Sequence, residues 1–240
     1  MSRRLPVLLI AVAAIVMAVC GVAISTPRTN VPTILALDPA DFVSVVDNPY
    51  FPLPIGRTLV YEGIKDGQTQ VDTVTVTNQT KVILGIRATV VSDVATHDGA
   101  VLERTSDWYA QDKQGNVWYL GEDTVHFLPN GKGDTSGSWE AGVSGAVPGI
   151  VMEANPQIPD AYRQEYLAGQ AEDTAWVVEV GGRITVPYGK VRNTLVTLEA
   201  TRLEPGAYDQ KVYARGIGIV HEQALTGDTE VANLVSVSGP

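Results

Sequence analysis

Two aromatic pairs around a short polar turn are the residues of this sequence best suited to hold a small molecule. Trp108-Tyr109 and Trp118-Tyr119 flank a turn at residues 112–116, a pattern that predicts a β-hairpin. Symmetric pairing about the turn would place Tyr109 opposite Tyr119 on one face and the tryptophans on the other. Aromatic faces give a large contact area at little entropic cost. The hairpin is therefore either the centre of the core or the wall of a binding surface.

The leading hypothesis for function is a non-catalytic protein that binds an apolar or amphiphilic ligand, such as a lipid or another apolar small molecule, in a concave sheet. It depends on the density of aromatic residues, since two of the four Trp and two of the nine Tyr fall in the hairpin. The same aromatics could instead pack a core. The predicted binding residues are Trp108, Tyr109, Trp118, Tyr119 and Trp139.

A second hypothesis is a secreted, glycan-directed hydrolase, which needs two carboxyl groups that face each other in one cleft. Glu140 follows Trp139 in a glycine-rich stretch, and Glu122 or Glu165 could act with it as acid and base. A solvated acidic surface is the simpler explanation of the carboxylates from which such a pair could be drawn, which are Glu140, Glu153, Glu165, Glu172 and Asp173. No Gly-x-Ser-x-Gly motif occurs. A third hypothesis is a structural domain that docks a partner through an exposed apolar patch.

The sequence predicts no metal site and no cofactor. In the hairpin turn only Asp112, Gly115 and Asn116 fit a calcium loop, and Lys113 interrupts it. A turn stabilised by Asp and Asn side chains explains this pattern better. The only cysteine lies in the N-terminal apolar run, which leaves no thiolate site in the rest of the chain. The histidines lack a second ligand at metal-site spacing; they are His97, His126 and His221.

Composition predicts a packed domain that does not bind nucleic acid. Of the 240 residues, 45% are hydrophobic and 18% are charged, as in chains that form a core. Asp and Glu number 27 against 17 Lys and Arg, which gives a net charge of −10. A chain with this charge repels phosphate backbones.

An N-terminal segment, residues 1–25, predicts export. A short positive start precedes an apolar run from Leu5 to Ile24, typical of a signal peptide or a membrane anchor. The small residues at 23–25 favour cleavage, but the run is long enough to stay and span a bilayer. Lipidation at Cys20 is a third outcome, although Val19 fits that processing poorly. We expect the protein outside the cell or on the outer face of the cytoplasmic membrane.

Residues 26–37 are predicted to form a linker and residues 38–240 a single β domain. From Thr58 onward, apolar and polar residues alternate with period two between glycine-containing turns, which predicts antiparallel strands. We expect an all-β fold, a large antiparallel meander rolled into a half-barrel or open barrel and preceded by the signal or anchor helix. The oligomeric state does not follow from the sequence.

Several local patterns add to this plan. Asp38-Pro39 is predicted to cap a helical turn that continues to Val46. The aromatics of the proline-rich run 48–54 are expected to close one end of the sheet. We further expect one strand at 81–95, a turn at Gly181-Gly182, and an irregular arm at 138–152 that is either a lid or a closely packed edge.

Three sequence blocks resemble an uncharacterised family of exported bacterial β-proteins, largely from actinobacteria, that share them in this order. The blocks are NPYFPLPIG at 48–56, DWYAQDKQGNVWYLGE at 107–122 and GSWEAGVSGAVPGIVM at 137–152. The resemblance implies an exported β-protein without an established activity. Residues 204–220, EPGAYDQKVYARGIGIV, are also similar to the closing strands of LolA-like envelope lipoproteins, whose half-barrels hold acyl chains. That local likeness implies a concave sheet and, by analogy of fold, an apolar ligand.

Overall fold

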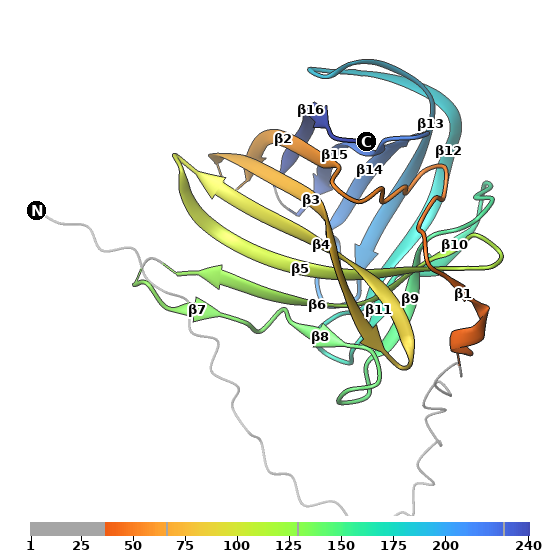
Figure 1. Cartoon of the computed structure of the whole chain (residues 1–240). Coiled ribbons are helices and arrows are strands. Elements are labelled where there is room, and N and C mark those ends of the chain that lie inside the picture. Colours follow the sequence, from red (N-terminus) through yellow and green to blue (C-terminus); the bar gives the residue numbers. More distant parts are fainter. Residues whose placement is uncertain (1–36, 66, 129, 228) are drawn as a thin grey trace, which may run out of the picture. The chain divides into compact units, whose positions relative to one another are not determined.

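The fold is all-β, as the sequence predicts. A computed structural model describes residues 37–65, 67–128, 130–227 and 229–240, which form antiparallel strands (Figure 1). The predicted signal or anchor segment, residues 1–25, lies outside the described residues, as does all but the last residue of the predicted linker. In the part of the chain that the structure describes, no helix has the length and apolar character needed to cross a membrane.

The described residues contain sixteen strands and one short 3-10 helix, η1. Their bounds are η1 Pro39–Asp41, β1 Phe42–Val43, β2 Thr58–Lys65, β3 Gln68–Ile83, β4 Ile86–His97, β5 Ala100–Asp112, β6 Val117–Phe127, β7 Gly133–Asp134, β8 Trp139–Glu140, β9 Val147–Met152, β10 Ala161–Arg163, β11 Glu165–Tyr166, β12 Asp173–Val186, β13 Gly189–Thr201, β14 Tyr208–Ala214, β15 Gly218–Thr226 and β16 Val231–Ser238.

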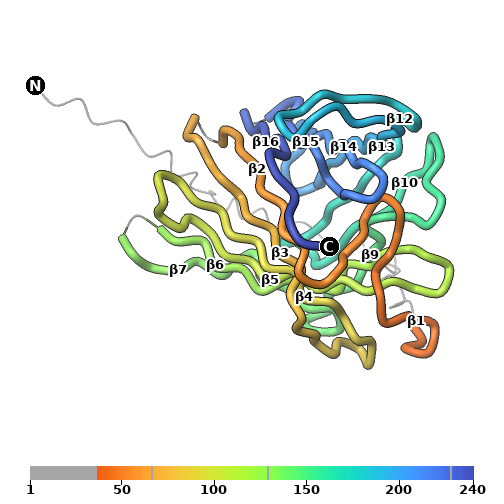
Figure 2. The backbone as a smooth tube through the Cα atoms, turned by 45° about the horizontal axis from the view of Figure 1, so that its top comes forward, coloured from red at the N-terminus to blue at the C-terminus, as the bar shows by residue number. Residues whose placement is uncertain are grey.

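The strands form one sheet whose two edges lie next to each other. The order is β10-β12-β13-β14-β15-β16-β2-β3-β4-β5-β6-β9-β11. Only Gln164 separates the edge strands β10 and β11 in sequence, and its backbone N–H donates to the carbonyl of Asp173 on β12 at 2.8 Å. The sheet is therefore rolled into a nearly closed barrel with one unsealed seam, which confirms the predicted open barrel (Figure 2).

The central hairpin has the predicted register near its turn and a β-bulge further along. Tyr109 pairs with Tyr119, and their stacked rings have centroids 4.9 Å apart. Beyond this pair the register shifts, so that Asp107 lies opposite Glu122. The extra residue of the bulge is on β6, where Gly121 has a φ of 131°. The bulge therefore keeps the two carboxyl groups on the same face as the two tyrosines.

Asp112 holds the hairpin turn together. Its buried carboxylate accepts hydrogen bonds from the backbone N–H and the side-chain amide of Asn116 and from the indole N–H of Trp118, each at 2.9 Å. This is the turn stabilised by Asp and Asn side chains that the sequence predicts in preference to a calcium loop.

The predicted N-terminal helical turn is shorter than expected. Asp38 does cap it, since the carboxylate accepts from the N–H of Ala40 at 2.9 Å. The turn is a 3-10 helix that ends at Asp41, however, and does not continue to Val46. Phe42 leaves the helix because it pairs with β5 as part of β1.

Two turns differ from the predicted ones. The expected strand 81–95 is interrupted by a turn at Leu84-Gly85, where both residues have positive φ angles of 52° and 81°. The expected turn at Gly181-Gly182 lies inside β12, because Gly182 pairs with Thr194 of β13 across an irregular register. The true turn of that hairpin falls at residues 187–188.

The predicted irregular arm, residues 138–152, contains the strands β8 and β9. A Cβ atom at Gly149 would lie 2.3 Å from the carbonyl oxygen of Arg163 and 2.4 Å from the carbonyl carbon of Gln164. Only glycine allows this approach of the β9 backbone to the edge segment. The arm therefore packs closely against the seam, which is the second of the two alternatives.

The proline-rich run packs into the barrel, as predicted. Asn48 is 2% exposed, and its amide donates to the backbone carbonyls of Gly115 at 2.9 Å and Glu153 at 3.0 Å. This anchor lets Phe51 pack edge-on against Tyr109 with ring centroids 5.0 Å apart.

Candidate functional site

The barrel contains a cavity of about 360 Å³, a size typical of small-molecule sites. Residues far apart in the sequence line it. We call the apolar members the apolar wall and the acidic members the carboxyl-bearing wall, and the two sets interleave where Val74 pairs with Asp93 and Val91 with Asp107. The apolar wall consists of Phe51, Pro52, Leu53, Leu59, Val74, Val91, Tyr109, Val151, Ile217 and Ile219. The carboxyl-bearing wall consists of Asp72, Asp93, Asp107, Glu122, Glu165, Asp173, Glu199, Glu222 and Glu230.

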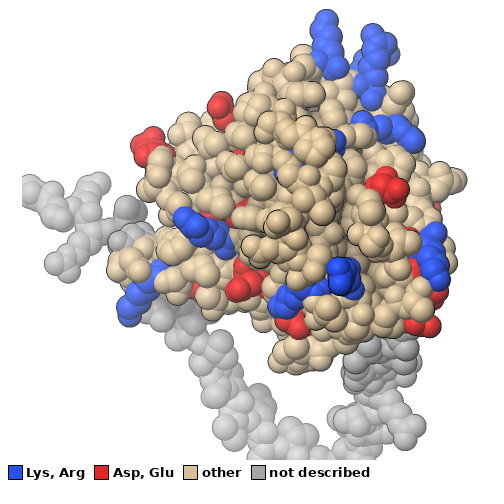
Figure 3. Space-filling view, viewed as in Figure 1, with Lys and Arg blue, Asp and Glu red and all other residues tan. Residues whose placement is uncertain are grey.

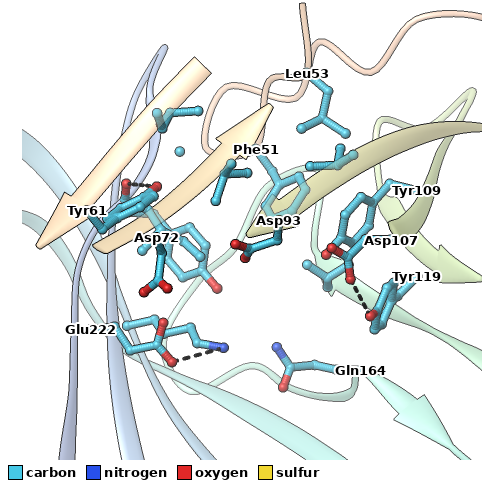
Figure 4. Close-up of a pocket in the computed structure, with 18 of the residues that line it drawn as sticks. Phe51, Leu53, Tyr61, Asp72, Asp93, Asp107, Tyr109, Tyr119, Gln164 and Glu222 are labelled. Carbon is cyan, nitrogen blue, oxygen red and sulfur yellow. Dashed lines mark hydrogen bonds and ion pairs between the residues drawn. The ribbon is translucent and has the colours of Figure 1, made fainter. Parts of the chain in front are cut away.

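Four of these acids lie on neighbouring strands and are here called the acidic band: Asp72 on β3, Asp93 on β4, Asp107 on β5 and Glu122 on β6. Alternate residues of a strand point to the same face, so an acid at an inward position points into the barrel. Figure 4 shows Asp72, Asp93 and Asp107 pointing into the same space. Asp107 and Glu122 are direct cross-strand partners, and like charges in such pairs destabilise a sheet.

Burial, together with repulsion from neighbouring carboxylates, raises the pKa values of the acidic band toward neutrality. Burial is the main cause in each case. It raises the pKa of Glu122 to about 8, with a contribution from Asp107, and that of Asp93 to about 7, with contributions from Asp107 and Asp72. The pKa values of Asp72 and Asp107 rise to about 6, and the Tyr119 hydroxyl opposes the rise at Asp107 by donating a hydrogen bond at 2.6 Å. The band therefore exchanges protons close to pH 7.

Lys211 is the one basic side chain among the described residues of the cavity wall. Its ammonium lies 2.9 Å from a carboxylate oxygen of Glu199 and 3.6 Å from one of Glu222. Glu199 also accepts hydrogen bonds from the hydroxyls of Thr197 at 2.8 Å and Tyr213 at 3.3 Å. Burial lowers the pKa of Lys211, but the two carboxylates outweigh burial and raise it. The lysine is thus a stable cation that is committed to these two partners.

Two of the five predicted binding residues, Tyr109 and Tyr119, line the cavity. Their stacked rings stand beside the acidic band, and burial raises the pKa of both hydroxyls well above the usual value. Both tyrosines therefore stay neutral and can donate hydrogen bonds at any physiological pH.

The three predicted tryptophans are not part of the cavity wall. Trp108 is buried, and the ammonium of Lys81 lies 3.3 Å above the centre of its ring. Trp118 contacts Phe42 edge-on with centroids 6.3 Å apart. Trp139 is 4% exposed and belongs to the same core cluster as Trp108. Trp108 and Trp118 pack the outer face of the hairpin, and Trp139 packs edge-on against Tyr119 with ring centroids 5.3 Å apart. Core packing is the alternative that the sequence left open.

Of the three predicted catalytic glutamates, two line the cavity and one does not. Glu122 and Glu165 both line the cavity, and burial together with Asp173 raises the pKa of Glu165 to about 7. Glu140 instead forms an ion pair with Lys81 at 2.7 Å, and its backbone pairs with Gly121. The structure therefore does not bring Glu140 to the cavity that the other two glutamates share.

The expectation that a solvated acidic surface explains these carboxylates is wrong for Glu165 and Asp173, which line the cavity. Nine of the 27 acidic residues line the cavity, Glu122 and Glu165 included. On the face shown in Figure 3 the acidic side chains are scattered and do not form one patch. These nine carboxyl groups thus face the cavity, where the lower effective dielectric constant strengthens the interactions between them.

The histidines have separate partners. His97 contacts the carbonyl of Thr69 at 2.7 Å, and His221 contacts the side-chain oxygen of Asn233 at 2.8 Å. His126 lies 3.6 Å from Glu103. In the described ranges, no group of three or more His, Cys, Asp or Glu residues has the geometry to hold a metal ion.

Sequence reasoning missed most of the acidic band. Asp93 and Asp72 each stand in an alternating run, D-x-V-x-V at residues 72–76 and V-x-D at residues 91–93. The available signal was their spacing from the valines. An acid that is two or four residues from the apolar residues of a strand faces the same side of the sheet as those residues. Lys211 has the same relation to Tyr213 two residues later.

No family model and no curated protein matches this sequence. Two solved structures are similar over most of their length. One is a predicted exported protein with a YmcC-like fold from Bacteroides fragilis, with 15% identity, a TM-score of 0.46, and coverage of 79% of this chain and 99% of the other. The second is a predicted lipoprotein from Parabacteroides distasonis, with 11% identity, a TM-score of 0.43, and coverage of 80% of this chain and 99% of the other.

Proposed function

We propose that this chain is an exported, non-catalytic binding protein that holds a small amphiphilic molecule inside the barrel. The observation that carries the proposal is that one cavity is lined both by apolar side chains and by carboxyl groups. A ligand with an apolar part and a polar part can satisfy both walls, whereas a purely apolar ligand would leave carboxyl groups such as that of Asp93 without a partner.

The apolar wall supports an alkyl or ring portion of the ligand. Figure 4 shows Phe51 and Leu53 on the side of the cavity away from Glu222 and Gln164. Each buried methylene of a ligand contributes about 0.8 kcal/mol, so even a short chain packed here would contribute several kcal/mol.

Export and family membership belong to the same proposal. The apolar run in residues 1–25 supports export, and the three blocks that resemble the exported actinobacterial family all take part in the barrel. The predicted hydrolase and the predicted partner-docking domain stay predictions.

Native mass spectrometry of the full chain, purified from its own host without added detergent, tests the proposal. We expect a small amphiphile to copurify with the wild-type chain. The variant Val74→Phe should lose most of it, because the ring fills the cavity beside Asp93, the cross-strand partner of residue 74.

Val82→Phe is the matched control, since Val82 lies on the same strand and is 65% exposed. This variant should keep the ligand. An equal amount of bound molecule in both variants would show that the cavity is not the binding site.

A further inference from the structure

We propose that the polar part of the ligand is a protonated amine, which the acidic band binds through Asp93 and its neighbours Asp72 and Asp107. This inference rests on the proposed function, since it names the chemistry of the ligand that the cavity would hold.

Asp93 is the acid of the band that most lacks a partner within the chain. Its side chain makes no hydrogen bond or ion pair with any described residue, although it lies deep in the barrel. Figure 4 shows the carboxyl group directed into the middle of the cavity. The side chain is half-buried and faces the cavity, where a charged group is less well solvated than at the surface, so a hydrogen-bond donor inside the cavity would stabilise it.

The chain itself does not supply that donor. Among the described residues of the wall, Lys211 is the one cation, and its ammonium is held by Glu199 and Glu222. Lys65, which is not part of the wall, pairs with Glu230 at 3.2 Å. Burial accordingly raises the pKa of Asp93 to about 7. An ammonium group beside Asp93 would supply both the positive charge and the hydrogen-bond donors that the band lacks.

The spacing of the acids favours an organic cation over a bare metal ion. Adjacent strands are about 4.8 Å apart, which spreads the acidic band over four strands. Consistent with this, no group of three or more acids, histidines or cysteines in the described ranges fits one metal ion. An alkylammonium has three donors that can reach carboxyl groups on different strands, while its chain reaches the apolar wall.

Isothermal titration of the full chain with three eight-carbon ligands at pH 7.5 tests the inference. The ligands are octylammonium, octanol and octanoate, each kept below the concentration at which it aggregates. We expect octylammonium to bind at least tenfold more tightly than octanol, and octanoate to bind most weakly. In Asp93→Asn the affinity for octylammonium should fall about tenfold, while that for octanol should change less than twofold.

Asp123→Asn is the control, because Asp123 is exposed on β6, and it should bind like the wild type. Equal affinities of octylammonium and octanol for the wild type would overturn the ammonium assignment and leave the amphiphile proposal in place. Failure of all three ligands to bind would overturn both. A preference for octylammonium that is undiminished in Asp93→Asn would overturn the role of Asp93, and Asp72→Asn provides the same test if the first variant does not fold.

Discussion

The free energy of unfolding of Glu122→Gln should exceed that of the wild type by about 2 kcal/mol at pH 8.5 and by much less at pH 5. In the folded chain the pKa of Glu122 is raised to about 8, first by burial and then by Asp107. A carboxyl group with a raised folded pKa keeps its proton in the folded state at pH values where the unfolded chain has lost it. The stabilisation that this retained proton gives to the folded state is therefore complete below about pH 4 and is lost as the pH rises toward 8.

Urea denaturation of both proteins between pH 5 and pH 8.5 measures this difference. The other acids of the band titrate together with Glu122, so the wild-type profile should itself decline over this range. Glu62→Gln is the control, because Glu62 is exposed on β2, and its profile should parallel that of the wild type. A stability difference between Glu122→Gln and the wild type that does not grow with pH would contradict the burial of this acid.

Lys211→Met should destabilise the protein by about 3–5 kcal/mol, since it leaves buried carboxylates without their counter-ion. The side chain of Glu199 is 9% exposed and that of Lys211 25%. Methionine preserves the length and packing of the lysine stem, so the loss reports on the charge. Urea denaturation at pH 7.5 is the measurement.

Lys65→Met makes the same change in an ion pair at a more exposed position. Lys65 lies 3.2 Å from Glu230, with side-chain exposures of 45% and 29%, and such pairs contribute about 0–1 kcal/mol. The double variant Lys211→Met/Glu199→Gln should recover part of the lost stability. Similar effects of Lys211→Met and Lys65→Met would mean that the Lys211 cluster is solvated and not buried.

The fold class and the central pairing follow from the sequence. Alternation with period two predicts the strands, and the polar turn fixes the register that places Tyr109 against Tyr119. The strands and the register of the hairpin depend on residues that are close in the sequence, so local patterns are enough to predict them.

The composition of the site depends on contacts that local patterns do not contain. The bulge at Gly121 changes which β6 residues share a face, and no turn pattern in the sequence predicts this bulge. The alternation of residues along a strand shows that Asp93 and Asp72 each lie on one face of the sheet, but it does not show that this face is the interior of the barrel. Only the closure of the sheet near Gln164 encloses that face. For the same reason, the sequence could not separate Glu122 and Glu165 from Glu140.

Carbon-13 NMR of the carboxyl groups of Asp93 and Glu122, followed from pH 4 to pH 9, tests the acidic cavity and its ligand together. Without a ligand the two groups should titrate with midpoints near 7 and 8, where burial places their pKa values. Saturating octylammonium should lower both midpoints by at least one pH unit, because a nearby cation favours the ionised carboxylate. Midpoints near 4 that do not respond to octylammonium would contradict the account, since they would mean that these carboxyl groups are solvated and do not meet the ligand.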